Sequence, residues 1–546
     1  MSTVRANAMM VSKRWMRMLT LVLGIALTLP VWAQCGAPST HTLAALKGNG
    51  TQALSAGRRV TVEATVSAAF VGDQALNGFY LQADTQGIFV YAPALELNSA
   101  PGVGERWRVQ ARTGRYRGRI QLEHPQRLEH CGDGSLTTHT LEPYHSDNYE
   151  RFADQPVRIE QSLSIADAYW LGRYGSLRVA LDGRAFHPGN GVDGGQLLDW
   201  VVDDGSYRRD PRPLPHAADE QVIRAGDVIA PFTGIMTYAF GQWRIHPLEP
   251  LKLTSRNPRP PKPDKAASGT LRAVNFNLYN YFIDRGGRGA QSPEAFARQR
   301  QRLRTTIQAM DADILALHEV QNAPAAVADL VAYLNANQPT PAHYQAAITQ
   351  RRRAAIRSVL LYRPARLTLE QVQRGKASVH PREPLAGTFS TPSGRRFAVA
   401  VAHFKSRGGC PDDGDTDRGE GCWADRRQRQ AEAMSGWLQD GPGKEPLLLL
   451  ADFNSYATEA AMQPWWSAGY IDLIAEHIAP QQRYTYIYRG QSGYLDHALA
   501  TPTFARWVKD VRLWPINADE PAYRAQSAEG VWRASDHDPI MVDWNF

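Results

Sequence analysis

A proline-rich stretch near the middle of the chain separates two halves with different hydrophobic patterns. Residues 257–264 read Asn-Pro-Arg-Pro-Pro-Lys-Pro-Asp, a composition typical of a semi-rigid linker without a core of its own. Before it, apolar and polar residues alternate in short runs, and after it, apolar runs alternate with helical patterns. A chain of 546 residues is also too long for one domain. We therefore expect a multidomain protein, all-β before a linker at 257–269 and α/β after it.

The half before the linker is expected to form two β domains. Within residues 34–135, Arg59–Val66 and Gly78–Gln82 alternate apolar and polar side chains between turn-rich stretches. Short strands at this spacing suit a small barrel such as an OB-fold, which often binds single-stranded nucleic acid. Either stacking and phosphate contacts or ordinary surface roles fit Tyr80, Tyr91, Tyr116, Arg112, Arg115, Arg117 and Arg119. Residues 136–256 are expected to form a second β-rich domain without a catalytic constellation.

The first 33 residues have the pattern of a secretory signal peptide. Four basic residues precede a short apolar run, Met18 to Leu29, and small or tolerated residues precede Gln34. The run is too short to cross a bilayer as a stable helix, so a membrane anchor is the weaker alternative. Removal of this segment lowers the formal net charge from +7 to +3 (7 − 4). We therefore expect a secreted monomer, extracellular or periplasmic, with no membrane anchor after cleavage.

The number of cysteines is consistent with an exported protein. Cys35, Cys131, Cys410 and Cys422 all remain after cleavage, and an even count in an exported chain indicates two disulfides. Cys410 and Cys422 would close a short local loop, which leaves Cys35 to pair with Cys131. A zinc site is the rival interpretation, but no spacing of histidines and cysteines supports it.

Acidic residues crowd the loop between the last two cysteines. Among them, Asp413, Asp415 and Asp417 place carboxylates at alternate positions. Oxygen ligands in such a pattern indicate a structural Ca²⁺ site. A solvated acidic loop explains the same residues, and both interpretations stay open.

Polar side chains follow the buried strands of the second half, at one strand end after another. In chain order they are Asn277, Glu319, His403, Asp452, Asn454, Asp496, Asp536 and His537. Each alone is ordinary, because strand ends enter loops where such residues are common. Together they match the needs of phosphodiester hydrolysis, which uses a divalent cation, a group that orients water, and a donor for the negative charge. Hard oxygen ligands such as Glu319 and Asp536 suit Mg²⁺, Mn²⁺ or Ca²⁺.

A basic segment surrounds one of these residues, His403. Between Arg351 and Arg407 the chain has thirteen lysines and arginines against only Glu370 and Glu383. Such a cluster is either a solvated face or a surface for a polyanion. Its place around a candidate catalytic histidine favours a polyanionic substrate.

The ordered motifs resemble those of the endonuclease/exonuclease/phosphatase superfamily. They are Phe276-Asn277, Glu319, His403, Asp452-Phe453-Asn454, Asp496-His497 and Ser535-Asp536-His537-Asp538-Pro539. Within it, the chain looks most like bacterial extracellular nucleases that carry OB-like domains before the catalytic one, through residues 257–260, 280–282, 421–423, 485–486 and 516–521. The resemblance implies that residues 270–546 form a four-layer α/β DNase I-like β-sandwich, the catalytic domain.

The resemblance also implies roles for the acidic and amide side chains. Asn277, Glu319 and Asp536 would gather around the catalytic metal. That metal would be Mg²⁺ or Mn²⁺, with Ca²⁺ as a structural or co-activating ion. Asp452 and Asn454 would orient the nucleophile, or a second metal, and contact the scissile phosphate.

The basic side chains receive roles in the same way. Arg382, in Arg382-Glu383-Pro384, resembles the superfamily's phosphate-contacting segment. His537, held by Asp496, would be general base or transition-state donor, and His403 would face it across the phosphate. Which histidine is base and which is acid stays open. The chain departs from the subfamily at Ala354, Ala402, Ala424 and Ala451.

Three functions follow. The first is a secreted, divalent-metal-dependent nuclease that hydrolyses phosphodiester bonds of extracellular DNA, with RNA as a further substrate. The second is a phosphodiesterase or phosphatase acting on lipid headgroups or sugar phosphates; for the lipid case only Trp465-Trp466 offers an apolar membrane-facing loop, and the pair fits a core equally well. The third, an inactive nucleic-acid-binding matrix protein, predicts loss of Glu319, Asp536 or His537, and all three are present.

Overall fold

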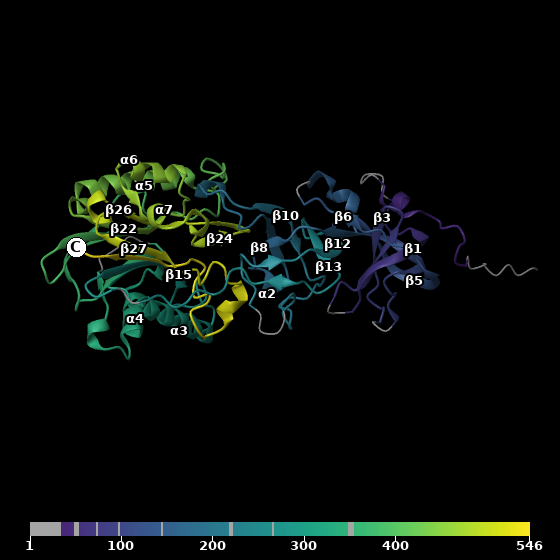
Figure 1. Ribbon diagram of the computed structural model, residues 1–546, viewed down its shortest axis with the longest axis horizontal. Coiled ribbons are helices and arrows are strands. Elements are labelled where there is room, and N and C mark those ends of the chain that lie inside the picture. Colours follow the sequence, from purple (N-terminus) through teal and green to yellow (C-terminus); the bar gives the residue numbers. More distant parts are fainter. Residues whose placement is uncertain are drawn as a thin grey trace, which may run out of the picture.

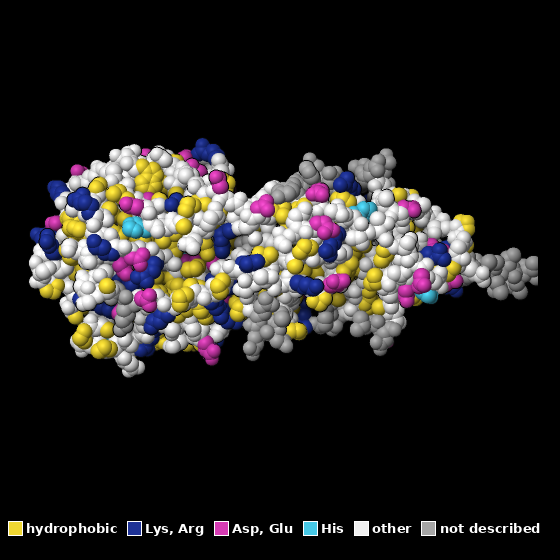
Figure 2. All heavy atoms as spheres, viewed as in Figure 1, with side chains coloured by type: hydrophobic (Ala, Val, Ile, Leu, Met, Phe, Trp, Pro, Cys, Tyr) yellow, Lys and Arg dark blue, Asp and Glu magenta, His cyan; other side chains and the backbone are white. Residues whose placement is uncertain are grey.

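The computed structural model describes residues 34–48, 54–72, 75–96, 99–143, 146–217, 222–264, 267–347 and 354–546. The expected signal peptide and Arg351–Arg353 lie outside these ranges. Figure 1 shows an elongated molecule in which a barrel, a middle β domain and a C-terminal α/β domain follow one another along the long axis. Basic and acidic side chains are interspersed over the face seen in Figure 2. Within the described ranges, no helix has the length and apolarity needed to cross a membrane.

The first domain is a closed five-stranded barrel preceded by the short helix α1 (Leu43–Lys47). Its strand order is β1-β2-β3-β5-β4, and β1 closes the barrel by pairing with both β2 and β4. The strands are β1 (Arg59–Phe70), β2 (Gly78–Ala83), β3 (Gln86–Tyr91), β4 (Glu105–Tyr116) and β5 (Arg119–Asp133). Alternate residues such as Val60 and Val62 fill the core, as period-two patterning predicts. Cys35 and Cys131 form a disulfide that joins the N-terminal segment to β5.

The middle domain is built on one nine-stranded sheet of order β14-β11-β8-β9-β10-β13-β12-β7-β6. Its strands are β6 (His139–Thr140), β7 (Gln155–Ile159), β8 (Leu163–Asp167), β9 (Leu177–Leu181), β10 (Gln196–Val202), β11 (Val228–Ile229), β12 (Phe232–Ala239), β13 (Gln242–Pro247) and β14 (Leu253–Thr254). Helix α2 (Leu171–Tyr174) joins β8 to β9. Tyr80 of the barrel is buried against Phe89 and Ile235. A stacking role for Tyr80 on an open barrel face is therefore wrong, because this face packs on the middle domain.

The C-terminal domain consists of two six-stranded sheets packed face to face. The first contains β15 (Leu271–Tyr281), β16 (Ile314–Gln321), β17 (Gln345–Ala347), β18 (Ile356–Tyr362), β27 (Val508–Leu513) and β28 (Ile540–Trp544). The second contains β19 (Thr368–Arg374), β20 (Leu385–Ser390), β21 (Arg396–His403), β22 (Leu447–Asp452), β23 (Ile471–Asp472) and β26 (Asp496–Ala500). An apolar core that includes Phe397 and Trp544 fills the space between them.

Helices cover the outer face of each sheet, which completes four layers (Figure 1). Helices α3 (Pro293–Met310) and α4 (Pro324–Asn335) pack on the first sheet, and α5 (Ala424–Asp440) and α6 (Gln463–Ser467) on the second. Ser292 caps α3 by accepting a hydrogen bond from the backbone N–H of Ala295, the role that serine commonly has at this position. Trp465 of α6 is fully buried, so it belongs to the core and does not form a membrane-facing loop. The expected four-layer α/β sandwich is confirmed.

The middle domain contacts the C-terminal domain through a hairpin, and the linker contacts it as well. The hairpin consists of β24 (Tyr486–Tyr488) and β25 (Gln491–Gly493), and Ser492 forms a β-bridge with Phe186 of the middle domain. In the linker, the Pro261 carbonyl accepts a hydrogen bond from the Trp514 indole. Figure 1 shows β24 at the end of the C-terminal domain that faces the middle domain.

Candidate active site

Three neighbouring strands of the second sheet bring three of the predicted site residues side by side. In the pairing of β21 with β22, His403 lies opposite Asp452. In the pairing of β22 with β26, Asp452 lies opposite Asp496. Because residues in register on neighbouring strands project on the same face, the sheet alone places these side chains together. All three are buried at about 1–2% exposure.

His537 reaches this row from the loop before β28. Its Nδ1 donates to Oδ2 of Asp496 at 2.7 Å, and Oγ1 of Thr485 donates to the same carboxylate oxygen at 2.7 Å. Burial lowers the pKa of His537, but the carboxylates of Asp496 and Asp536 outweigh it and raise this pKa well above 6.5. Since Nδ1 is taken by Asp496, Nε2 is the ring nitrogen that remains for a substrate.

Asp452 is the centre of the hydrogen-bond network. Its Oδ2 accepts from Nδ2 of Asn277 at 3.0 Å and lies 3.4 Å from Nε2 of His403. Its Oδ1 accepts from the backbone N–H and from Nδ2 of Asn454, each at 3.0 Å. Burial and the nearby charge of Asp496 raise the pKa of Asp452 to about 7. Burial lowers the pKa of His403 well below 6.5, with Arg382 adding to the effect, so His403 is neutral where His537 is charged.

Glu319 and Asp536 form the acidic side of the site. Burial raises the pKa of Glu319, and the charge of Asp536 raises it further. Glu319 stands at φ 59° within β16, where the pairing registers with β15 and β18 both shift. Its Oε2 accepts from the backbone N–H of Asn280 at 2.9 Å, and Asn280 has φ 59° as well. Non-glycine residues in this region are strained and cluster at functional sites.

Arg382 is brought to the same place. Its Nε donates to the carbonyl of His403 at 2.9 Å, and Nη2 donates to the carbonyl of Phe404. Burial lowers the pKa of Arg382 to about 10, while the charges of Asp452 and Glu319 act against that change. The guanidinium is thus held by backbone beside the acidic centre, where it can meet a phosphate.

The sequence did not reveal the support behind the site. Asn275 of β15 donates from Nδ2 to the carbonyls of Ala451 and His497, at 3.2 and 3.3 Å, and so bridges the two sheets. Its Oδ1 pairs with Nε2 of the buried His318 at 2.6 Å, and Nδ1 of His318 pairs with the Ser358 hydroxyl at 3.0 Å. These residues look like core positions in the sequence, and only their contacts show that they hold the strands that carry Asn277, Glu319 and Asp452.

The predicted role of the basic segment at 351–407 is largely wrong. Most of its described arginines form ion pairs with acidic residues. The pairs are Arg363–Asp311, Arg366–Asp313, Arg374–Glu383, Arg396–Glu370 and Arg407–Glu459. Arg357 is buried. Within the segment, Arg382 has a charge that lowers the pKa of His403, as does Arg288 from outside the segment. Sequence proximity to His403 was therefore a poor guide to proximity in space.

The proposed calcium loop is also corrected. Asp415 accepts hydrogen bonds from the backbone N–H groups of Asp425 and Arg426, and Asp417 accepts from those of Gly419 and Gly421. These carboxylates therefore cap the start of α5 and a turn. Asp413 does not join them: among the described residues, the only group of three acidic or histidine side chains with converging ligand atoms is Asp452, Asp496 and His537. Cys410 and Cys422 form the disulfide that closes this loop.

The donor set around Glu319 fits a hard divalent cation. Two half-buried carboxylates, Glu319 and Asp536, repel each other, and Oδ1 of Asn280 is buried with no hydrogen-bond partner among the described atoms. Carboxylate and amide oxygens are the ligands that Mg²⁺, Mn²⁺ and Ca²⁺ prefer. Asn277 lies between this acidic side and Asp452, with its Oδ1 accepting from the Tyr279 backbone N–H at 2.9 Å.

Comparisons with known proteins agree on the C-terminal domain. Residues 274–537 match the model of the Endonuclease/Exonuclease/phosphatase family. A search of curated proteins finds no match. Among solved structures, the human Nocturnin catalytic domain with bound sulfate is 18% identical, covering 51% of this chain and 94% of that one at a TM-score of 0.36.

Two further structures match a similar share of the chain. The mannosyl-6-phosphatase Bt3783 of Bacteroides thetaiotaomicron is 18% identical, covering 50% of this chain and 100% of that one at a TM-score of 0.36. TDP2 of D. rerio complexed with single-strand DNA product is 13% identical, covering 51% and 100% at 0.35. Because every TM-score is below 0.5, none of these likenesses supports an inference about substrate.

Proposed function

We propose that this chain, which contains an endonuclease/exonuclease/phosphatase domain at residues 274–537, is a secreted, divalent-metal-dependent nuclease. That family consists of hydrolases that act on phosphoester bonds. The single observation that carries the proposal is the 2.7 Å bond between His537 and Asp496 beside Asp452, with Glu319 and Asp536 on the facing side. This arrangement brings together a protonated donor (His537), a buried carboxylate of raised pKa (Asp452) and a cation site (Glu319 and Asp536).

The chemistry follows from these groups. The oxygen of a water molecule forms a bond to phosphorus while the bond from phosphorus to the leaving oxygen breaks. Asp452, whose pKa of about 7 suits a base near neutral pH, orients that water and accepts its proton. His537 donates from Nε2 to a phosphoryl oxygen, where negative charge accumulates, and the leaving oxygen takes a proton from solvent. A divalent cation held by Glu319 and Asp536 would polarise the phosphoryl group and stabilise the leaving oxygen.

The N-terminal region supports a polymeric substrate. A closed five-stranded barrel of order β1-β2-β3-β5-β4 has the strand number of an OB-fold, so we assign it as OB-like. Such barrels commonly bind single-stranded nucleic acid. Because the face with Tyr80 and Phe89 packs on the middle domain, a polymer would contact another part of this barrel. The two disulfides agree with an exported enzyme, since disulfides persist in oxidising compartments.

Plasmid cleavage tests the proposal. Supercoiled plasmid, an end-labelled linear duplex and a labelled RNA are incubated with the full chain and Mg²⁺, Mn²⁺ or EDTA. We expect metal-dependent cleavage that His537→Ala abolishes and that the exposed control His477→Ala retains. Plasmid nicking indicates an endonuclease, whereas shortening of the linear duplex alone indicates an exonuclease. Hydrolysis of a sugar phosphate or phospholipid, without cleavage of DNA or RNA under any metal, would overturn the nuclease in favour of a phosphatase or phospholipid-directed enzyme.

A further inference from the structure

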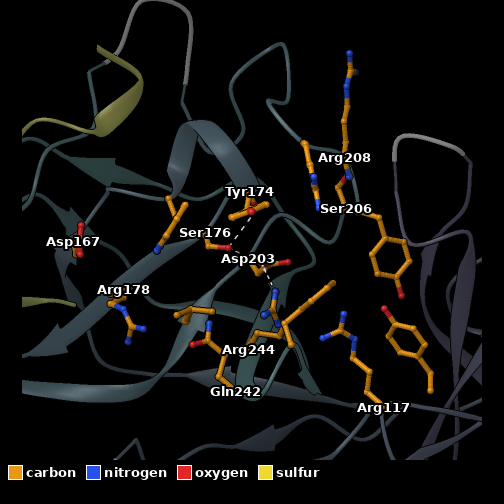
Figure 3. Close-up of a pocket in the computed structure, with 16 residues that line it drawn as sticks. Arg117, Asp167, Tyr174, Ser176, Arg178, Asp203, Ser206, Arg208, Gln242 and Arg244 are labelled. Carbon is orange, nitrogen blue, oxygen red and sulfur yellow. Dashed lines mark hydrogen bonds and ion pairs between the residues drawn. The ribbon is translucent and has the colours of Figure 1, made fainter. Parts of the chain in front are cut away.

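A cavity of about 540 Å³ opens in the middle domain, where the domain faces the tip of the barrel (Figure 3). Its volume lies in the range of roughly 300–1,000 Å³ typical of ligand sites. Five aromatic side chains that line it are exposed: Tyr116, Trp170, Tyr174, Tyr207 and Phe240. Grouped exposed rings of this size mark a contact surface, since water otherwise disfavours them.

The rings form contiguous pairs along the cavity. Tyr116 packs on Tyr207 with ring centroids 6.4 Å apart, and Tyr207 packs on Phe240 at 6.3 Å. On the other side, Trp170 lies 5.2 Å from Tyr174. Two aromatic walls thus flank the same opening.

Arginines give the cavity a positive charge. Five line it, Arg117, Arg178, Arg208, Arg209 and Arg244, against the two acids Asp167 and Asp203. Figure 3 shows Arg117 and Arg178 on opposite sides of the pocket. Arg117 extends from the turn between β4 and β5, with its guanidinium 4.3 Å from the Phe240 ring. Cationic groups beside exposed rings favour an anion with planar parts.

The floor of the cavity is rigid and polar. Asp203 accepts from Nη1 of Arg244 at 2.6 Å and from the Ser176 hydroxyl at 2.7 Å. Nη2 of Arg244 donates to the Ala239 carbonyl at 3.0 Å, while its Nε is buried with no hydrogen-bond partner among the described atoms. Arg244 therefore occupies a fixed position and retains one unpaired donor.

A line of aromatic residues leads from this cavity to the catalytic centre. Trp170 lies 4.8 Å from Tyr169, ring to ring. Tyr169 lines a second cavity of about 280 Å³ together with Tyr279 and Ser535. Asn280, which lines the same cavity, donates its backbone N–H to Oε2 of Glu319 at 2.9 Å. Tyr169 and Tyr279 are both exposed, so the line continues the aromatic surface of the first cavity.

We propose that this cleft binds unpaired nucleotides of a single-stranded nucleic acid and directs the strand to the catalytic centre. The bases stack on the aromatic rings and the phosphates meet the arginines, the combination used for single strands irrespective of sequence. In a duplex the base faces are covered by their neighbours and cannot reach these rings. The inference rests on the proposed function and specifies the form of its substrate.

Binding without cleavage tests the cleft. Fluorescence anisotropy is measured on the full chain in EDTA with a labelled 20-nucleotide oligo-dT, with the same strand in a duplex, and with heparin as an anionic polysaccharide. We expect the single strand to bind most tightly. Trp170→Ala removes one stacking ring and weakens binding by about 5- to 100-fold. Arg117→Asn, which tolerates the φ of 48° at this turn, lowers the salt dependence of binding.

Matched controls lie at the far end of the C-terminal domain. Phe546→Ala and Arg506→Ala remove an exposed ring and an exposed arginine there, and we expect single-strand binding to stay as in the wild type. Thermal unfolding verifies that each variant is folded. If Trp170→Ala is unstable, Arg117→Asn decides the question.

The outcomes separate this inference from the proposed function. Single-strand binding that Trp170→Ala and Arg117→Asn leave unchanged overturns the cleft, as does equal or tighter binding of duplex or heparin. Hydrolysis of bis(p-nitrophenyl) phosphate with Mg²⁺ or Mn²⁺ reports on the catalytic centre alone. If the wild type shows no such hydrolysis and no nucleic-acid cleavage, the nuclease proposal fails while weakened binding by the variants still supports the cleft.

Discussion

Arg224 of the middle domain donates from Nη1 to Oε1 of Glu520 in the C-terminal domain at 2.6 Å, and both side chains are buried. Glu520 follows a segment that positions His537 of the candidate active site. In that segment, Nδ2 of Asn517 donates to the carbonyl of His537 at 2.7 Å, and Oδ1 of Asp538 accepts from the backbone N–H of Asn517 at 2.6 Å. Through the pair of Arg224 with Glu520, the middle domain therefore stabilises the segment that contacts the loop of His537.

Arg224→Met should destabilise the protein and slow catalysis. Removing one member of a buried ion pair leaves the other charge uncompensated, which costs about 3–5 kcal/mol. The second arginine on Glu520, Arg259 at 2.7 Å, limits the loss to the lower end of that range. Thermal unfolding and hydrolysis of a small phosphodiester measure the two effects. The control Arg158→Met breaks a half-exposed pair with Glu160 and should cost about 1 kcal/mol or less; equal losses in the two variants would contradict the prediction.

Asp496→Asn should reduce kcat/KM for a phosphodiester by about 10³- to 10⁴-fold while the fold is retained, because a carboxylate that fixes a catalytic imidazole has an effect of that size. The substitution also removes the charge that keeps the pKa of His537 raised, so the alkaline limb of the pH–rate profile should move to lower pH. Asp440→Asn, an exposed change at the end of α5, is the control. A variant with near wild-type kcat/KM and an unshifted profile would remove His537 from the mechanism.

Glu319→Gln should weaken metal binding independently of any measurement of rate. A cation that binds only the folded state at one hundred times its Kd stabilises that state by about 2.7 kcal/mol. We therefore expect Mg²⁺ or Mn²⁺ to raise the Tm of the wild type, and Glu319→Gln to need a higher metal concentration for the same shift. Glu432→Gln, an exposed change on α5, should behave as the wild type. The same metal dependence of Tm in all three proteins would place the cation elsewhere.

Asp204 predicts a pH dependence of stability in the middle domain. Burial and the adjacent charge of Asp203 raise its pKa to about 7. Because the folded pKa lies above the unfolded value near 3.8, the stability that this group contributes is present below pH 4 and is lost as the pH rises to about 7. The loss amounts to about 4 kcal/mol at most.

Asp204→Asn tests this effect, because the amide keeps an acceptor for the Ser206 backbone N–H but carries no charge. The Tm of the variant minus that of the wild type should increase as the pH rises from 4 to 7, and this difference should stay constant above pH 8. Asp193→Asn, an exposed change in the same domain, is the control. A constant difference between Asp204→Asn and the wild type would show that the Asp204 carboxyl ionises normally.

Local patterns predicted those features that depend on neighbours in sequence. Strands β21 and β22 end at His403 and Asp452, as expected for polar residues that follow buried strands. These strand ends follow from the hydrophobic period and from strand-end chemistry. The register that places His403, Asp452 and Asp496 side by side comes from the structure.

Contacts between distant segments could not be predicted in this way. The arginines at 363–407 seemed to form a free basic surface because their acidic partners, such as Asp311 and Glu459, stand far away in the sequence. The sequence left Tyr80 as a candidate surface residue, but in the structure the middle domain covers it. The bridge from Asn275 to His497 likewise joins two sheets through residues that lie 222 positions apart in the sequence. The sequence therefore predicted the positions of strands better than it predicted which charged and polar residues form the site.

The acidic loop offers a last test, since its carboxylates cap backbone instead of binding calcium. Both oxygens of Asp415 accept N–H groups at the start of α5, at 3.0 and 2.9 Å, where the helix dipole favours negative charge. Asp415→Ala should lower the free energy of unfolding by about 1–2 kcal/mol, the usual cost of a lost helix cap, with or without Ca²⁺. Asp412→Ala on the same exposed loop should change it by less than about 0.5 kcal/mol. Calcium titration followed by Tm is the measurement, and a Ca²⁺-induced rise in the wild type that Asp415→Ala abolishes would restore the metal site that the hydrogen bonds argue against.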